Sequence, residues 1–164
     1  MQNLKSLKPC LWFDSEAEDA AKFYCAIFKD SKITRTSRYS GEGQEIHGGK
    51  PGSVMVVEFE VDGHPFQALN GGPLFKFSEA ISFSIECRDQ AEVDYYSERL
   101  IADGGEQGPC GWLKDKFGLS WQVVPEQLPK MLADSDRTRS DRTMKAMLQM
   151  KKLDIAKLQE AYNG

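Results

Sequence analysis

The chain has 164 residues, of which 40% are hydrophobic and 28% charged, and its formal net charge is −4 at pH 7. This length predicts one domain with its own core and leaves little room for a second. Basic and acidic residues are interleaved, so the basic face that nucleic-acid binding requires is not expected. Apolar runs are too short to cross a bilayer, and residues 1–8 lack the apolar stretch of a signal peptide, so we expect a cytoplasmic protein without membrane partners.

The first half of the chain predicts a strand, a helix and three further strands. Apolar runs and alternating patterns indicate the strands, and an apolar stripe at helical spacing indicates the helix. Ser15 and Glu18 have the spacing of a capping box at the start of that helix. Segment 40–53 is rich in glycine but opens no predicted helix and lacks the pattern of a phosphate-binding loop, so we interpret it as a mobile hairpin connection. The expected elements are strand 9–13, helix 17–28 and strands 33–40, 54–61 and 64–70.

The same order begins again after the break at Gly71-Gly72-Pro73. Asp89 and Glu92 have the spacing of a second helix cap, and residues 116–118 predict the turn of a closing hairpin. On the new first strand, bulky residues alternate with small polar ones, so the bulky face is expected under the helix. The expected elements are strand 80–87, a helix through residue 100, and strands 110–115 and 119–124.

After Pro125 the sequence predicts helices alone. An apolar stripe that includes Met144 and Met147 indicates a core or subunit contact in preference to a groove for outside partners. This apolar face leads us to expect a homodimer. The expected helices are 128–133, 136–150 and 153–162.

The two halves are copies of one unit. An aromatic pair, Phe23-Tyr24 or Tyr95-Tyr96, stands at the same distance along each copy. Two copies are too few for a solenoid, so we predict an α+β fold in which two βαβββ modules pair into one cupped mixed sheet. The predicted parts of this single domain, 1–164, are module 8–72, module 73–125 and a helical extension 126–164.

Several motifs carry a resemblance to a known superfamily. They are LWFD with the FY pair of the first helix, ALNGGP, AISFSIEC with DQAEVD, and CGWLKDKFGLSWQVVP. The chain resembles the vicinal-oxygen-chelate superfamily of glyoxalase I, bleomycin-resistance proteins and extradiol dioxygenases. Within it the chain is similar to the PhnB-like group, often labelled 3-demethylubiquinone-9 3-methyltransferase. The resemblance implies that the two sheets enclose a cleft for a ligand or metal, and it specifies no reaction.

The resemblance also implies where metal-using members would hold a divalent ion. These places fall near Pro9, on Phe66 or Gln67, on Ala80 or Ile81, and on Gln122. Glutamine oxygens alone do not replace the three or four His, Cys or carboxylate ligands that hold a transition metal tightly. His47 lies in the glycine-rich connection and His64 at a hairpin corner. We therefore expect no metal and no cofactor.

Polar side chains on the predicted floor of the cleft are the candidates for ligand binding. Trp112 offers a flat surface to an aromatic or quinone-like compound, with core packing as the alternative, and the neighbouring Lys114 is suited to an anionic group or to a solvated turn. The face of strand 110–115 that lines the cleft is left open. The candidate ligand-binding residues are Gln67, Asn70, Ser82, Ser84, Cys110, Trp112 and Gln122.

No catalytic residue is predicted. The four cysteines match no redox or zinc motif, so reduced thiols are expected, and no histidine lies near Cys110 in the sequence. Glu58 and Glu60 share a strand face as an acid–base pair would, but alternation explains them equally. Two functions remain: a binding protein for a small aromatic molecule, and a metal-free isomerase or lyase-type enzyme. The methyltransferase label is a further alternative, although Asp14-Ser15-Glu16 after the first strand has no glycine for an S-adenosylmethionine loop.

Overall fold

The computed structural model describes residues 7–164 and divides the chain into two compact units, Met1–Lys76 and Phe77–Gly164. The division lies close to the predicted break after residue 72. The expectation that residues 1–8 are not a signal peptide falls mostly on residues 1–6, which lie outside the described residues. Within residues 7–164, the helices are all too short or too polar to span a membrane.

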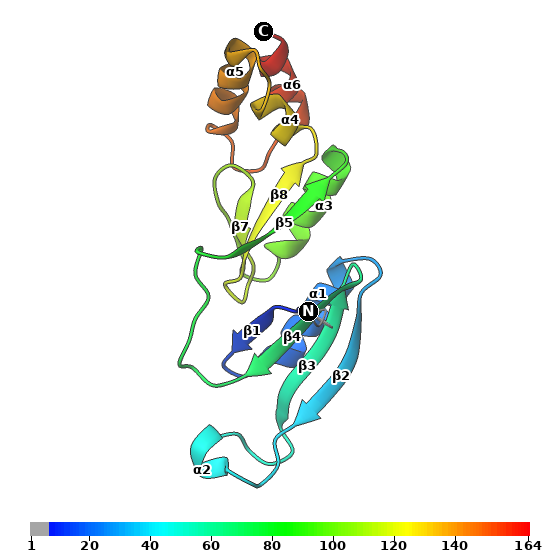
Figure 1. Cartoon of the computed structure of the whole chain (residues 1–164), viewed down its shortest axis with the longest axis vertical. Helices are drawn as coiled ribbons and strands as arrows, with labels where there is room; N and C mark the ends of the chain where they lie inside the picture. Colours follow the sequence, from blue (N-terminus) through cyan, green and yellow to red (C-terminus); the bar gives the residue numbers. More distant parts are fainter. Residues whose placement is uncertain (1–6) are drawn as a thin grey trace, which may run out of the picture. The chain divides into compact units, whose positions relative to one another are not determined.

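The first unit has the predicted βαβββ order with one added helix (Figure 1). Its four strands form one mixed sheet in the order β1-β4-β3-β2, in which β1 runs parallel to β4. The added helix, α2, lies between Gly43 and Gly48, both of which have positive φ. The prediction of a connection without a helix was therefore wrong in this detail. The elements are β1 (Cys10–Phe13), α1 (Ala17–Ile27), β2 (Lys32–Arg38), α2 (Gln44–His47), β3 (Val54–Val61) and β4 (His64–Asn70).

Helix α1 covers one face of the first sheet. Its small residues Ala17, Ala20 and Ala21 are fully buried, which lets the helix approach the strands closely. Tyr24 on the same stripe stacks on Phe59 of β3, with 6.1 Å between ring centroids. The apolar stripe read from the sequence is thus the buried stripe of the helix.

The start of α1 is capped by a residue distant in sequence. The N–H of Ala17 donates to Oδ1 of Asn70 at 2.8 Å, and Nδ2 of Asn70 donates to the carbonyl of Val54 at 3.1 Å. The carboxylate of Glu16 accepts from the N–H of Ser15, and Glu18 forms an ion pair with Lys22. The predicted capping box is therefore not formed, because the neighbouring strand β4 supplies the capping oxygen instead.

The second unit repeats the strand order of the first, β5-β8-β7-β6. Helix α3 begins as predicted, with Asp89 accepting from the N–H of Glu92 at 2.9 Å. Strand β6 was not located in the sequence, because a strand of two residues has no periodicity. The elements are β5 (Ser82–Cys87), α3 (Gln90–Leu100), β6 (Glu106–Gln107), β7 (Trp112–Lys114), β8 (Ser120–Pro125), α4 (Leu128–Leu132), α5 (Arg137–Met147) and α6 (Ile155–Asn163).

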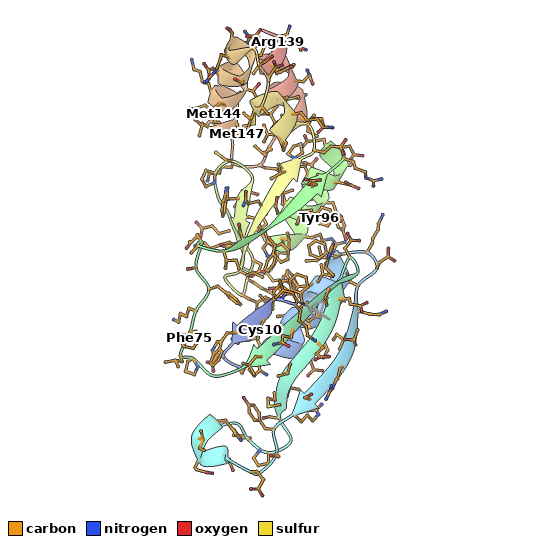
Figure 2. The ribbon with its side chains drawn as sticks, viewed as in Figure 1. Cys10, Phe75, Tyr96, Arg139, Met144 and Met147 are labelled. Atoms are coloured by element: carbon orange, nitrogen blue, oxygen red, sulfur yellow. The ribbon has the colours of Figure 1, made fainter. Side chains whose placement is uncertain are left out.

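The three C-terminal helices form a small cluster after the end of β8 (Figure 1). Their own apolar core is made of Leu128, Met131, Leu153 and Leu158. Figure 2 shows Met144 and Met147 on α5; Met147 packs against this core, whereas Met144 is 41% exposed. The predicted apolar stripe is therefore divided between a core contact and the surface.

Candidate ligand site

The strand register of the second sheet places most of the predicted residues on one face. Ser82 lies opposite Ser120, and Ser84 lies opposite Gln122. Gln122 also lies opposite Trp112 on its other side. Directly opposite residues share a face of a sheet, so four of the predicted residues, Ser82, Ser84, Trp112 and Gln122, lie together. We call this the polar face; it also includes Lys114 and Ser120.

The opposite face of this sheet is apolar. Leu113 pairs with Trp121, and Trp121 pairs with Phe83 at 5.5 Å between ring centroids. Val93 and Leu100 of α3 are fully buried, and this helix contacts β5, β7 and β8. The register therefore settles which residues of β7 face away from the helix: Trp112 and Lys114.

A cavity of about 480 Å³ opens beside the polar face, a size within the range of small-molecule sites. Ser120 is only 1% exposed, and its Oγ has no hydrogen-bond partner among the described residues. A buried hydroxyl without a partner costs about 1–3 kcal/mol. Ser120 therefore marks a place where a bound molecule can donate or accept a hydrogen bond. The lining of this Ser120 cavity is Glu79, Glu106, Gly108, Pro109, Trp112, Leu113, Lys114 and Ser120.

Sequence reasoning missed Ser120, although one signal pointed to it. Gln122 was predicted to face the ligand, and residues two apart on a strand share a face. Gln122 itself donates from Nε2 to Oγ of Ser82 at 2.9 Å. Two of the predicted residues are thus bonded to each other, whereas Ser120, which lies opposite Ser82 on the same face, keeps its hydrogen-bonding capacity.

The charged groups of the cavity favour an uncharged ligand. Nζ of Lys114 donates to Oε1 of Glu79 at 2.9 Å. This hydrogen bond raises the pKa of Lys114 and lowers the pKa of Glu79. With Glu106, the lining holds two carboxylates and one ammonium group, which leaves one net negative charge. Lys114 is therefore ion-paired, and an anionic partner or a solvated turn for it stays a prediction.

The two candidates from the first unit do not share a face. Gln67 pairs with Cys10 and Glu58 on the face away from α1. Asn70 is three residues further along β4, so alternation directs its side chain to the helix side, where it caps α1. Gln67 and Asn70 therefore lie on opposite faces of the first sheet, the amide of Asn70 caps α1, and neither residue lines the Ser120 cavity.

Cys110 also lies apart from the polar face. It precedes β7, its φ of 55° is in the left-handed region, and its Sγ donates to the carbonyl of Met147 in α5 at 3.6 Å. The chain turns at this residue, so the predicted strand 110–115 is shortened at its start.

All four cysteines are free, and burial raises the pKa of Cys87 to about 12.

The residues at the superfamily's metal positions include few side chains with a donor atom for a metal. Groups of three or more His, Cys, Asp or Glu side chains able to hold a metal ion are absent from residues 7–164. His47 stacks on Tyr39 at 4.5 Å, and His64 begins β4. Glu58 and Glu60 each form an ion pair with a lysine, Lys8 and Lys32 respectively. Glu58 and Glu60 are therefore each ion-paired, and the expectation of no metal stays a prediction.

Comparison with known proteins defines the family. The family model described as 3-demethylubiquinone-9 3-methyltransferase matches residues 5–124. The PhnB protein from Bacillus cereus is 30% identical, with a TM-score of 0.61, and the match covers 74% of this chain and 99% of that one. The chain therefore belongs to the 3-demethylubiquinone-9 3-methyltransferase family, the PhnB-like group.

Two more distant structures share the fold. A Pseudomonas aeruginosa protein is 18% identical, with a TM-score of 0.57, and the match covers 74% of this chain and 98% of that one. The fosfomycin resistance protein FosX from Mesorhizobium loti is 16% identical, with a TM-score of 0.55, and the match covers 80% of this chain and 100% of that one. The α+β class and the glyoxalase/bleomycin-resistance-like modules predicted from the sequence are confirmed. No protein of curated function matches the chain.

Proposed function

We propose that this protein binds a small, neutral, planar molecule, aromatic or quinone-like, in the Ser120 cavity, and that it does so without a metal ion. One observation carries the proposal: Oγ of Ser120 is buried and unpartnered in the wall of a cavity that Trp112 also lines. Trp112 offers a flat apolar surface for stacking, and Ser120 offers a hydroxyl to a carbonyl or phenol oxygen. This pair of groups suits a ring that carries a polar atom at its edge.

The charge of the lining supports a neutral ligand. An anionic ligand would have to displace Glu79 from Lys114 and would then face the carboxylates of Glu79 and Glu106. Like charges brought together repel, and at these exposed positions the cost in free energy is small but unfavourable to an anion. A quinone or a neutral phenol avoids this cost.

An isomerase or lyase-type enzyme is the second candidate, and it is favoured by one observation: two carboxylates line the cavity. However, the hydrogen bond from Lys114 lowers the pKa of Glu79, which makes this carboxylate a weaker base. Glu79 is thus a less favourable proton acceptor than a carboxylate without such a hydrogen bond. Binding without turnover is the better supported function.

The methyltransferase activity in the family's name is not the function we propose. S-adenosylmethionine enzymes of the usual kind use a doubly wound parallel sheet with a glycine-rich loop after the first strand. Here each sheet is mixed and has four strands, and β1 is followed by Asp14, Ser15 and Glu16. These residues do not provide the backbone cradle of such a loop.

Further expectations from the sequence stay proposals. They are a cytoplasmic location, a homodimer, and the pairing of the two modules into one cupped sheet within a single domain. Sedimentation velocity over a range of concentrations tests the dimer, and a monomer at all of them would overturn it.

Titration with duroquinone tests the function. This quinone is fully methylated, so its ring offers no open carbon to the free cysteines. Wild-type protein should show saturable quenching of tryptophan fluorescence and a rise in Tm with ligand concentration. Ser120→Ala should weaken the affinity about fivefold through the lost hydrogen bond, whereas Ser84→Ala, on the exposed part of the same face, should not.

The anionic probe anthraquinone-2-sulfonate should bind more weakly than duroquinone. If neither quinone stabilises the wild type at its solubility limit, the proposal is wrong. Equal losses from Ser120→Ala and Ser84→Ala would show that the ligand binds outside the Ser120 cavity.

A further inference from the structure

The C-terminal helices are attached to the wall of the Ser120 cavity. Gly108 and Pro109 line this cavity, and Cys110 and Gly111 follow them directly. The N–H of Cys110 donates to the carbonyl of Met150 at 2.8 Å, and the N–H of Gly111 donates to the carbonyl of Lys151 at 2.7 Å. We call residues 108–112 the rim and residues 150–155 the clamp.

Close packing reinforces these hydrogen bonds. Gly111 has a φ of +81°, and a Cβ at this position would lie 2.7 Å from the carbonyl oxygen of Val123 and 3.0 Å from Cδ1 of Leu153. Leu153 is fully buried in the core of the helical extension. The extension's core therefore rests directly against the backbone of the rim, and a side chain at residue 111 would push the two apart.

The clamp is held on its other side by helix α3. The carbonyl of Leu153 accepts from Nε2 of Gln90 at 3.1 Å, and the N–H of Ile155 donates to Oε1 of Gln90 at 2.9 Å. Nζ of Lys152 lies 2.7 Å from Oδ1 of Asp94, and their hydrogen bond lowers the pKa of Asp94 and raises the pKa of Lys152. The clamp thus joins a rigid helix to the cavity's rim.

The clamp lies outside the part of the chain that matches the family model. This match ends at residue 124, before α4 begins. The match to the Bacillus cereus protein covers 99% of that chain but 74% of this one. The contacts that fix Cys110 and Gly111 therefore come from a segment beyond the family match.

We infer that the clamp is a positioning segment for the ligand site: it fixes the rim, and through the rim it sets the place of Pro109 and Trp112 against the ligand. This inference rests on the proposed function, because it assigns the helical extension a part in binding at the Ser120 cavity. The cavity is then shaped partly by residues outside the two βαβββ modules.

The test uses the full chain with Gln90→Ala and Lys152→Ala combined, which removes the contacts of α3 with the clamp. The matched control is Gln159→Ala combined with Lys22→Ala, which removes the same residue types from contacts outside the clamp and the rim, with Asn163 and Glu18. Amide hydrogen exchange at Cys110 and Gly111 reports on the rim. Duroquinone titration reports on the site.

In the clamp variant we expect exchange at Cys110 and Gly111 to be about tenfold faster, with β5 unchanged, and duroquinone affinity to fall by a similar factor. The control should change neither. Replacing Lys152 by Arg instead of Ala in the clamp variant should restore part of both losses, because the ion pair with Asp94 is kept.

Three outcomes would overturn the inference. Unchanged exchange at Cys110 and Gly111 would show that the clamp does not fix the rim. Faster exchange with unchanged affinity would show that the rim does not position the ligand, and the proposed function would stand. Wild-type protein that binds no duroquinone would instead refute the proposed function and, with it, this role of the clamp in binding.

Discussion

The two βαβββ units share a scaffold but differ in what they present on it. Both sheets have the same strand order, and equivalent strands supply one row of neighbouring residues across each sheet. In the first unit the row is Cys10, Gln67, Glu58 and Arg35, and in the second it is Ser82, Ser120, Lys114 and Glu106. The small Ser120 therefore stands where the first unit has the larger Gln67, and the two charged positions carry opposite signs.

The two units therefore share their strand pairing but differ in the chemical character of the side chains at equivalent positions. Glu58 pairs with Lys8, which precedes β1, and Lys114 pairs with Glu79, which precedes β5. The ion pair is present in both units with its charges exchanged. The buried unpartnered hydroxyl belongs to the second unit, so the row at Ser120 is where we place the ligand.

The largest effect is expected when the first unit's residue is put into the second. Ser120→Gln fills the cavity beside Trp112 and should reduce duroquinone affinity about a hundredfold or more, because a larger side chain takes the ligand's space. The reciprocal change, Gln67→Ser, should leave the affinity unchanged. Titration of both variants checks this, with thermal unfolding to confirm that each is folded; full binding by Ser120→Gln would place the ligand elsewhere.

The second largest effect is expected on the free energy of unfolding, when the N-terminal cap of α1 or of α3 is removed. Asn70→Ala removes the cap of α1 and the bond to Val54, and should lower the free energy of unfolding by about 2 kcal/mol. Asp89→Ala removes only the local cap of α3 and should cost about 1 kcal/mol. Urea unfolding measures both values. Equal costs would contradict the double role of Asn70.

A smaller and opposite effect on stability is expected at Ser120. Ser120→Ala removes a buried hydroxyl that has no partner within the described chain, so the unliganded protein should be equally stable or more stable by up to about 1 kcal/mol. The same variant binds duroquinone more weakly. A clear loss of stability in the absence of ligand would mean that the hydroxyl already has a structural partner.

The smallest effect is the pH dependence of the exposed ion pair. The hydrogen bond from Lys114 lowers the pKa of Glu79 below its ordinary value of 4.5. A carboxyl with a lowered pKa stabilises the folded state above its ordinary value, and this contribution is lost as pH falls through the lowered pKa. The small stability advantage of wild type over Lys114→Met should therefore disappear at acid pH. An advantage that persists after Glu79 is fully protonated would exclude Glu79 as the partner.

Patterns of local sequence were sufficient to predict the two modules and to group Ser82 and Ser84 on one face of β5, because alternation along a strand is a local property. The face of β7 was left open, and the strand register places Trp112 beside Gln122. The cap of α1 was predicted wrongly because its oxygen comes from Asn70, far along the chain.

Like the cap of α1, the unpartnered hydroxyl of Ser120 depends on contacts between residues that are not neighbours in local sequence patterns. The buried carboxylate of Asp115 accepts hydrogen bonds from the N–H groups of Phe117 and Leu119 and from Nε1 of Trp121. The turn before Ser120 sets the register that brings this residue opposite Lys114. Register and burial depend on tertiary contacts, so the unpartnered state of the hydroxyl was not predictable from the sequence.

The exchanged charges of the two ion pairs have a consequence for folding of a duplicated chain. Similar segments in one polypeptide can assemble with the wrong copy while the chain folds. If β1 joined the second sheet, Lys8 would meet Lys114, and if β5 joined the first, Glu79 would meet Glu58. Like charges repel in both mispaired arrangements. We therefore expect the opposite polarity to disfavour both mispaired arrangements.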